Sequence, residues 1–151
     1  HELRTRRMGS QLLADMHIHV NPLISVSEGH HIGDRVMQVL EEKFKALSDV
    51  VVHIDPEDDF EMPNPSGLPL RSEIEEAVRK TLVSSNSGSR LFTTGNFSLV
   101  LHYVGVSVTG EVVVALPSGK SGEAMRDESA TLSKKLVEET PLSDVRILYR
   151  V

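Results

Sequence analysis

The sequence has 151 residues, of which 39% are hydrophobic and 25% charged, a composition typical of a globular chain. The net charge of −6, the absence of tryptophan and the scarcity of other aromatic residues argue against nucleic-acid binding, which favours basic patches and stacking aromatics. Without cysteine, disulfides and thiolate metal ligands are excluded. The longest apolar run, Val112 to Leu116, is too short to cross a bilayer. Because the chain starts at His1, we interpret it as a soluble fragment of a longer protein.

The first third of the chain has the pattern strand, strand, helix, strand. Gly9-Ser10 predicts a turn after a loosely alternating edge strand, and Pro56 ends the last strand. The helix opens with the capping box Ser25-Val26-Ser27-Glu28, and its Gly29 and Gly33 are small enough to let another element approach closely. The predicted elements are strands at 1–8 and 12–20, a helix at 25–46 and a strand at 49–55.

Residues 57–70 are predicted to be a linker. The stretch from Pro56 to Leu70 carries four prolines, a glycine and an acidic run, a composition that regular elements do not tolerate. We therefore expect one domain at 1–56 and a second at 71–151. The second is predicted to contain a helix at 71–84, strands at 97–104 and 106–116, a helix at 122–139 and a strand at 144–151.

The two predicted domains match one another when the chain is shifted by about 95 positions. Leu47-Ser48-Asp49-Val50 then falls on Leu142-Ser143-Asp144-Val145, and only the second domain has a leading helix. In this alignment four polar residues of the first domain are replaced. They are His17, His30, His53 and Asp55, which fall on Val112, Met125, Leu148 and Arg150. The second domain should therefore lack the chemistry that these four groups support.

The same four residues are candidate metal ligands. Side chains alternate along a strand, so His53 and Asp55 point to the same side of theirs. Three imidazoles and one carboxylate, from His17, His30, His53 and Asp55, suit zinc or another divalent transition-metal cation. The alternative is that they are solvated side chains on exposed surfaces. If His17 and His53 face away from the helix, His30 reaches them only at the sheet edge near the helix start, or from a second chain.

Four segments of the first domain resemble the C-terminal cytoplasmic domain of cation diffusion facilitator transporters. The segments are His1-Glu2-Leu3-Arg4-Thr5-Arg6, Asp15-Met16-His17-Ile18-His19-Val20, Ser25-Val26-Ser27-Glu28-Gly29-His30 and Asp49-Val50-Val51-Val52-His53-Ile54-Asp55-Pro56. They occur in consistent order and spacing over residues 1–56. Residues 57–151 are only loosely similar and look like a second, degenerate copy of the same module.

The resemblance implies a regulatory domain, and no enzyme, within a homodimeric membrane protein that exports divalent cations, usually zinc, in exchange for protons. The implied fold is an α+β, ferredoxin-like or metallochaperone-like α-β-β-α-β module, in tandem here, with the first copy lacking its leading helix. The family's ligand positions carry over onto His17, His30, His53 and Asp55. Its partners would be a second copy of the chain, divalent cations and the transporter's own transmembrane domain, absent from this chain. The domain would lie on the cytoplasmic side of the inner (cell) membrane.

Two other functions stay open at this point. The histidines could be vestigial in a purely structural dimerisation module, because the second domain dispenses with them. A small-molecule-binding ferredoxin-like regulator or enzyme would need a deep apolar pocket with convergent polar groups. We favour metal sensing, in which two acidic protomers repel one another and a bound cation shifts the population towards a closer dimer. Metal affinity should then fall at low pH, because protons compete for the imidazoles.

Overall fold

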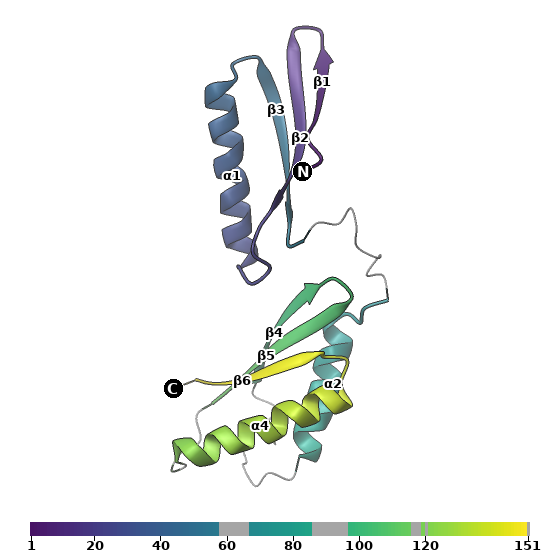
Figure 1. Ribbon diagram of the computed structural model, residues 1–151, viewed down its shortest axis with the longest axis vertical. Helices are drawn as coiled ribbons and strands as arrows, with labels where there is room; N and C mark the ends of the chain where they lie inside the picture. The colour runs from purple at the N-terminus through teal and green to yellow at the C-terminus, as the bar shows by residue number, and fades with distance from the viewer. Residues whose placement is uncertain (58–66, 86–96, 116–118, 120, 151) are drawn as a thin grey trace. The chain divides into compact units, whose positions relative to one another are not determined.

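The structure is a computed structural model that describes residues 1–57, 67–85, 97–115, 119 and 121–150. The chain divides into two compact units, His1–Pro63 and Asn64–Val151 (Figure 1). Part of the predicted linker, residues 58–66, lies outside the described residues. Among the described helices, none is long and apolar enough to cross a membrane.

Unit 1 is a three-stranded sheet with one helix packed on one of its faces (Figure 1). Its elements are β1 (Arg4–Met8), β2 (Gln11–His19), α1 (Val26–Lys43) and β3 (Leu47–Asp55). β1 pairs with β2 antiparallel, and β2 pairs with β3 parallel. A parallel pair needs a crossover connection, which α1 supplies. The order strand, strand, helix, strand predicted from the sequence is confirmed.

The helix α1 is fixed at its start by a side-chain cap and along its length by close contact with β3. The backbone N–H of Glu28 donates to Ser25 Oγ at 3.1 Å, as the capping box predicts. The helix ends at Lys43, three residues before the predicted end. A Cβ atom on Gly29 would lie 3.3 Å from Ile54 Cγ2, and one on Gly33 would lie 3.2 Å from Ile54 Cδ1. The predicted close approach at these glycines is therefore confirmed, and the neighbour is the end of β3.

Unit 2 has the complete α-β-β-α-β order, which confirms the predicted α+β fold class. Its elements are α2 (Arg71–Ser84), β4 (Phe97–Val104), β5 (Ser107–Ala115), α4 (Gly122–Glu139) and β6 (Asp144–Arg150). The sheet order is β4-β5-β6, with an antiparallel and then a parallel pair as in unit 1. The hydrophobic core combines both helices and the sheet. Its fully buried members include Ile74, Val78, Leu136, Val108 and Val112.

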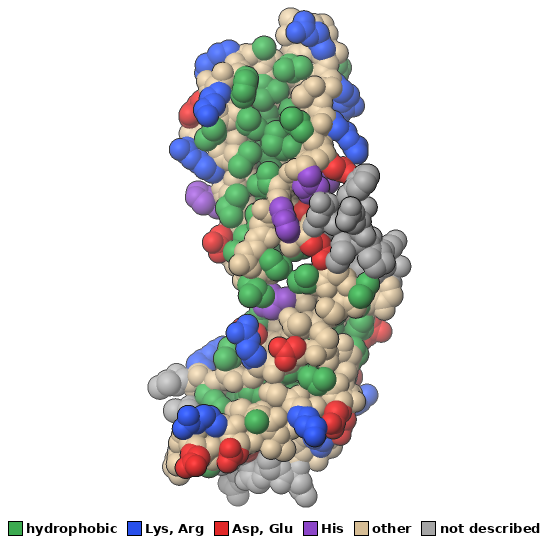
Figure 2. Space-filling view, in the orientation of Figure 1, with side chains coloured by type: hydrophobic (Ala, Val, Ile, Leu, Met, Phe, Trp, Pro, Cys, Tyr) green, Lys and Arg blue, Asp and Glu red, His purple; other side chains and the backbone are tan. Residues whose placement is uncertain are grey.

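The two units differ in how completely they bury their apolar side chains. In the described part of unit 1 only Ala14 and Val50 are buried hydrophobic residues, whereas unit 2 has a continuous core. Figure 2 shows hydrophobic side chains gathered on the visible face of unit 1. The reason is a missing helix. In unit 2 the helix α2 contacts α4 and buries Ile74, Val78 and Leu82 in the shared core, whereas the described part of unit 1 has no counterpart of α2.

The structure corrects the sequence alignment of the two units by one residue in the hairpins. Both hairpins turn through two residues, Gly9-Ser10 and Gly105-Val106, with positive φ values of 62° and 58° at the glycines. Gly105 follows Gly9 by 96 positions, not 95, so the counterpart of His17 is Val113. The predicted counterpart, Val112, is wrong, because it is fully buried on the core face whereas His17 lies on the opposite face. A one-residue slip exchanges the two faces of a strand.

Candidate metal site

The polar side chains of unit 1 gather on the sheet face that points away from α1. Ala14 and Val50 are buried on the helix side, so alternation places His17, His53 and Asp55 on the other side. The parallel register sets His17 directly beside His53. Their rings stack with centroids 4.5 Å apart and an interplanar angle of 22°.

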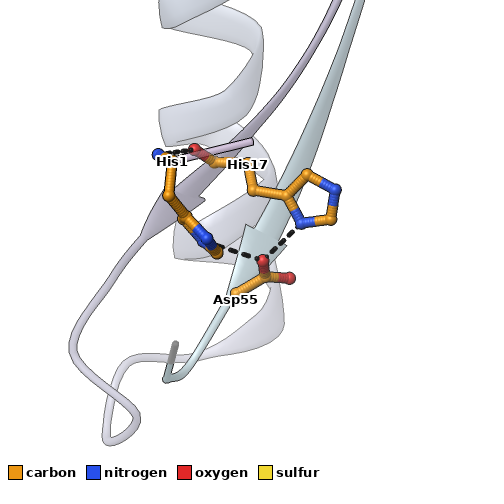
Figure 3. Close-up of side chains that lie close together, drawn as sticks. All are labelled: His1, His17 and Asp55. Atoms are coloured by element: carbon orange, nitrogen blue, oxygen red, sulfur yellow. Dashed lines mark hydrogen bonds and ion pairs between the residues drawn. The ribbon is translucent and has the colours of Figure 1, made fainter. Parts of the chain in front are cut away.

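Asp55 is the centre of the site. The residue is only 9% exposed, and its Oδ2 accepts a hydrogen bond from His17 Nδ1 at 2.7 Å. The same oxygen lies 3.3 Å from His1 Nε2, so two imidazoles converge on one carboxylate oxygen (Figure 3). A buried carboxylate needs such partners, because burial without them costs several kcal/mol, roughly 2–7 for a neutral polar group and more for a charge. The other ring nitrogen of His17, Nε2, lies 3.6 Å from Glu2 Oε2.

The donor set fits a small divalent cation. One ligand atom each from His1, His17 and Asp55 can be chosen so that all lie within 4.8 Å of one another. Bonds of about 2.1 Å in a tetrahedral arrangement would place ligand atoms about 3.4 Å apart. The 3.3 Å between His1 Nε2 and Asp55 Oδ2 already matches this spacing. Two imidazoles and one carboxylate are a zinc-like ligand set that leaves a fourth position for another donor.

The predicted ligands are distributed over both faces of the sheet. His17 and Asp55 are brought together, and the exposed His53 stacks on His17. His30 lies on α1, on the helix side, with its Nε2 3.5 Å from Asp34 Oδ2. It lines a pocket of about 370 Å³ together with Ile54, Pro56, the first turn of α1 and the connection that leads from β2 to this helix. Within the described residues, His30 therefore is not part of the cluster around Asp55.

Reasoning from the sequence missed His1 as a candidate ligand. His1 belongs to a segment that resembles the transporter family, but neither spacing nor alternation pointed to a metal-binding role for it. The predicted turn at Gly9-Ser10 was the available signal, because a hairpin folded there returns the first residues to the neighbourhood of His17. Simple alternation along the strand would still have assigned His1 to the wrong face.

Unit 2 carries different chemistry at the equivalent positions. Val113, Leu148 and Arg150 stand where unit 1 has His17, His53 and Asp55. The guanidinium of Arg150 donates to Ser98 Oγ at 3.3 Å. The described residues of unit 2 contain no group of histidine and acidic side chains comparable to that around Asp55.

Comparisons with known proteins relate unit 1 to the cytoplasmic domain of cation efflux proteins. Residues 1–57 match the family model described as "Cation efflux protein, cytoplasmic domain". Metal tolerance protein C1 of Arabidopsis thaliana is 27% identical over 150 residues, covering 93% of this chain and 31% of that protein. The cation-efflux pump FieF of Pectobacterium atrosepticum is 34% identical over 56 residues, 37% of this chain and 18% of the pump. The chain thus spans less than a third of the length of either relative.

Among solved structures, a variant of the MamM CTD is 26% identical. It matches 38% of this chain and 68% of its own, with a TM-score of 0.37. A second MamM CTD variant, also 26% identical, covers 38% of this chain and 72% of its own, with a TM-score of 0.36. The family match and the curated relatives confirm the resemblance seen in the sequence: residues 1–57 match the cytoplasmic domain of cation efflux proteins.

Proposed function

We propose that the chain is a regulatory part of a divalent-cation efflux transporter, and no enzyme, in which unit 1 binds metal and homodimerises. The observation that carries the proposal is the convergence of His1 and His17 on the shielded carboxylate of Asp55. The names of the relatives, metal tolerance protein and cation-efflux pump, support handling of metal ions. The nitrogen and oxygen donors suit zinc or a similar transition metal better than calcium or magnesium, which prefer all-oxygen sites.

His53 and His30 are further ligands in this proposal, through different routes. His53 is exposed and adjacent to His17, so rotation of its ring out of the stack would bring it to the open fourth position. His30 lies on the helix side of the sheet, with its side chain 78% exposed. It would serve a site completed by a second copy of the chain, which would couple metal binding to dimerisation.

Charge neutralisation is the proposed driving force for the conformational response. Glu2 and Asp15, on or beside the open face, are paired with Arg4 at 3.0 Å and with Arg6 at 3.4 Å, so the repulsion between two copies would come from Asp55 and from the net charge of −6 of the chain. A bound dication reduces this repulsion and favours a closer dimer, which shifts the population that the membrane part of the transporter would sense. In this proposal residues 1–56 form the metal-binding module on the cytoplasmic side of the membrane, residues 57–70 the linker and residues 71–151 a degenerate second module.

A zinc titration by calorimetry tests the proposal, with an acetylated Gly-Ser extension before His1, because a free terminal amine would compete as a ligand. The chain should bind zinc saturably, and His17→Ala should weaken binding at least tenfold. His19→Ala is the matched control, because His19 is an exposed histidine of the same strand whose Nε2 bonds to the carbonyl of Pro56 at 3.0 Å. Small-angle scattering should show a more compact dimer with zinc. Equal dimer dimensions with and without zinc would contradict the regulatory mechanism.

The second candidate function is a structural dimerisation module without functional metal binding. Unit 2 favours it, because this unit keeps the fold with Val113, Leu148 and Arg150 at the equivalent positions. Dimerisation of the chain without any zinc binding in the titration would establish this alternative.

A further inference from the structure

The chain reaches β1 through an irregularity in its pairing with β2. The backbone nitrogen of His1 donates to the carbonyl of His17 at 3.1 Å, and the N–H of His17 donates to the carbonyl of His1 at 3.2 Å. His1 is therefore directly opposite His17, whereas the next regular pair is Arg4 with Asp15. Two residues, Glu2 and Leu3, thus lie opposite the single residue Met16. This two-against-one arrangement is a β-bulge.

Glu2 holds the bulge in a conformation that usually requires glycine. Its φ of 52° lies in the left-handed region, and no other non-glycine residue described in the structure has a positive φ. In one common type of bulge the first bulged residue takes this conformation and is normally glycine. A glutamate there is strained, and such strain is retained mainly where the surrounding structure or a function requires it.

The bulge decides which face of the sheet His1 occupies. In a regular ladder His1 would lie opposite Ile18, whose side chain shares the helix-facing side with Ala14. The extra residue moves His1 into register with His17, on the open face. Its ring then lies 5.3 Å from that of His17, and its Nε2 lies 3.3 Å from Asp55 Oδ2 (Figure 3).

Unit 2 shows the same strand without the bulge. Aligned on the two glycine turns, Phe97 is the counterpart of His1, and Val114 is the counterpart of Ile18. Phe97 pairs regularly with Val114 and packs against the hydrophobic core. The regular ladder therefore directs this position to the helix side, as expected for unit 1 if the bulge were absent.

We propose that Glu2 is a positioning residue, whose bulge turns His1 onto the open face of unit 1 and so completes the ligand group with His17 and Asp55. The inference rests on the proposed function for the metal itself. The orientation of His1 can be tested without metal. Glu2 acts here through its backbone conformation, so its carboxylate is not required.

Three changes at Glu2 separate the backbone from the side chain. Glu2→Val disfavours a positive φ, because valine is β-branched, and should restore the regular ladder and turn His1 towards the helix side. Glu2→Gly accepts the positive φ and should keep the bulge. Deletion of Glu2 removes the extra residue, which leaves His1 opposite His17 in a regular ladder, on the open face. We therefore expect Glu2→Val to lose the site, and Glu2→Gly and the deletion of Glu2 to keep it.

Zinc affinity is measured for each variant in the chain with an acetylated Gly-Ser extension before His1, alone and combined with His1→Ala. Glu2→Val should weaken binding about tenfold or more, to the level of His1→Ala, and should have no further effect in the His1→Ala background. Glu2→Gly and the deletion should stay within about threefold of the original chain. Unchanged affinity of Glu2→Val, or a loss in the deletion as large as in His1→Ala, would overturn the proposal.

Proton NMR of the metal-free chains separates this inference from the function on which it rests. The His1 ring should show nuclear Overhauser contacts to His17 in the original chain and in the deletion, and to helix-side residues such as Ile18 in Glu2→Val. Identical contacts in the original chain and Glu2→Val would overturn the role of the bulge. An original chain that shows the expected contacts but binds no zinc would refute the proposed metal binding and leave the positioning of His1 supported.

Discussion

Replacing Asp55 with asparagine removes the charge on which the two imidazoles of the site converge. The Asp55 side chain is 12% exposed, with Oδ2 2.7 Å from His17 Nδ1 and 3.3 Å from His1 Nε2. A dication and a carboxylate about 2.1 Å apart attract one another by about 4 kcal/mol even at a dielectric constant of about 80. Because asparagine keeps a polar amide oxygen, we expect a loss of about 3 kcal/mol, close to a hundredfold in the zinc Kd.

The same substitution should affect folding much less than metal binding. In the metal-free chain it exchanges a charged hydrogen bond for a neutral one, a difference of about 1 kcal/mol in the free energy of unfolding. Calorimetric zinc titration at about pH 7.5 measures the first effect, and urea denaturation measures the second. A fall in stability as large as the fall in zinc binding would show that the variant merely unfolds the unit.

Asp15→Asn is the matched control for Asp55→Asn. Asp15 is on the same sheet face but pairs with Arg6 at 3.4 Å and is 33% exposed. The Asp15→Asn substitution should change the zinc Kd less than about threefold, because charges open to solvent are screened by water and salt. Equal losses in the two variants would refute the reasoning, since zinc would then respond to the acidic surface as a whole and not to a site at Asp55.

Three further changes probe the protonation of the site and the packing of each unit. Lowering the pH from about 7.5 to about 5.5 should weaken zinc binding in the same titration, because protons compete for the imidazole nitrogens of His1 and His17. Unchanged binding would mean that these imidazoles are not ligands. Replacing Gly29 or Gly33 with alanine gains about 1 kcal/mol of helix propensity in either case. The new methyl group of Gly29→Ala would press on the branch carbon Cγ2 of Ile54, whereas that of Gly33→Ala would press only on the flexible end of the same side chain, Cδ1. Gly33→Ala should therefore be the more stable of the two in urea denaturation, and the opposite order would contradict this account of the packing. Leu136 is fully buried in unit 2, so Leu136→Ala should lower the free energy of unfolding by about 2–5 kcal/mol and leave the zinc affinity of unit 1 unchanged. Denaturation and titration of the same variant measure the two effects. A stability loss well below this range would mean that the core closes around the cavity.

The sequence was informative wherever one local rule decides the structure. Period-two alternation in β3 separated the buried Val50 from His53 and Asp55 on the opposite face, and the structure keeps that division. The Ser25 cap and the glycine turns fixed the start of α1 and the two hairpins to within a few residues. These features depend on neighbours a few positions apart, so they can be predicted without knowing what packs against them.

Only the tertiary structure decided which donors meet. A single extra residue at Glu2 moves His1 to the face of His17, and a one-residue difference in offset makes Val113, not Val112, the counterpart of His17. The sequence pattern predicts neither the bulge nor the change in offset, because a bulge depends on pairing with a strand that lies more than ten residues away in the chain. His30 illustrates the same limit, since its spacing suits a ligand but the sheet separates its helix from the open face. Residue types and local periodicity thus determined the elements and most of the candidate donors, whereas strand register determined which of them share a face.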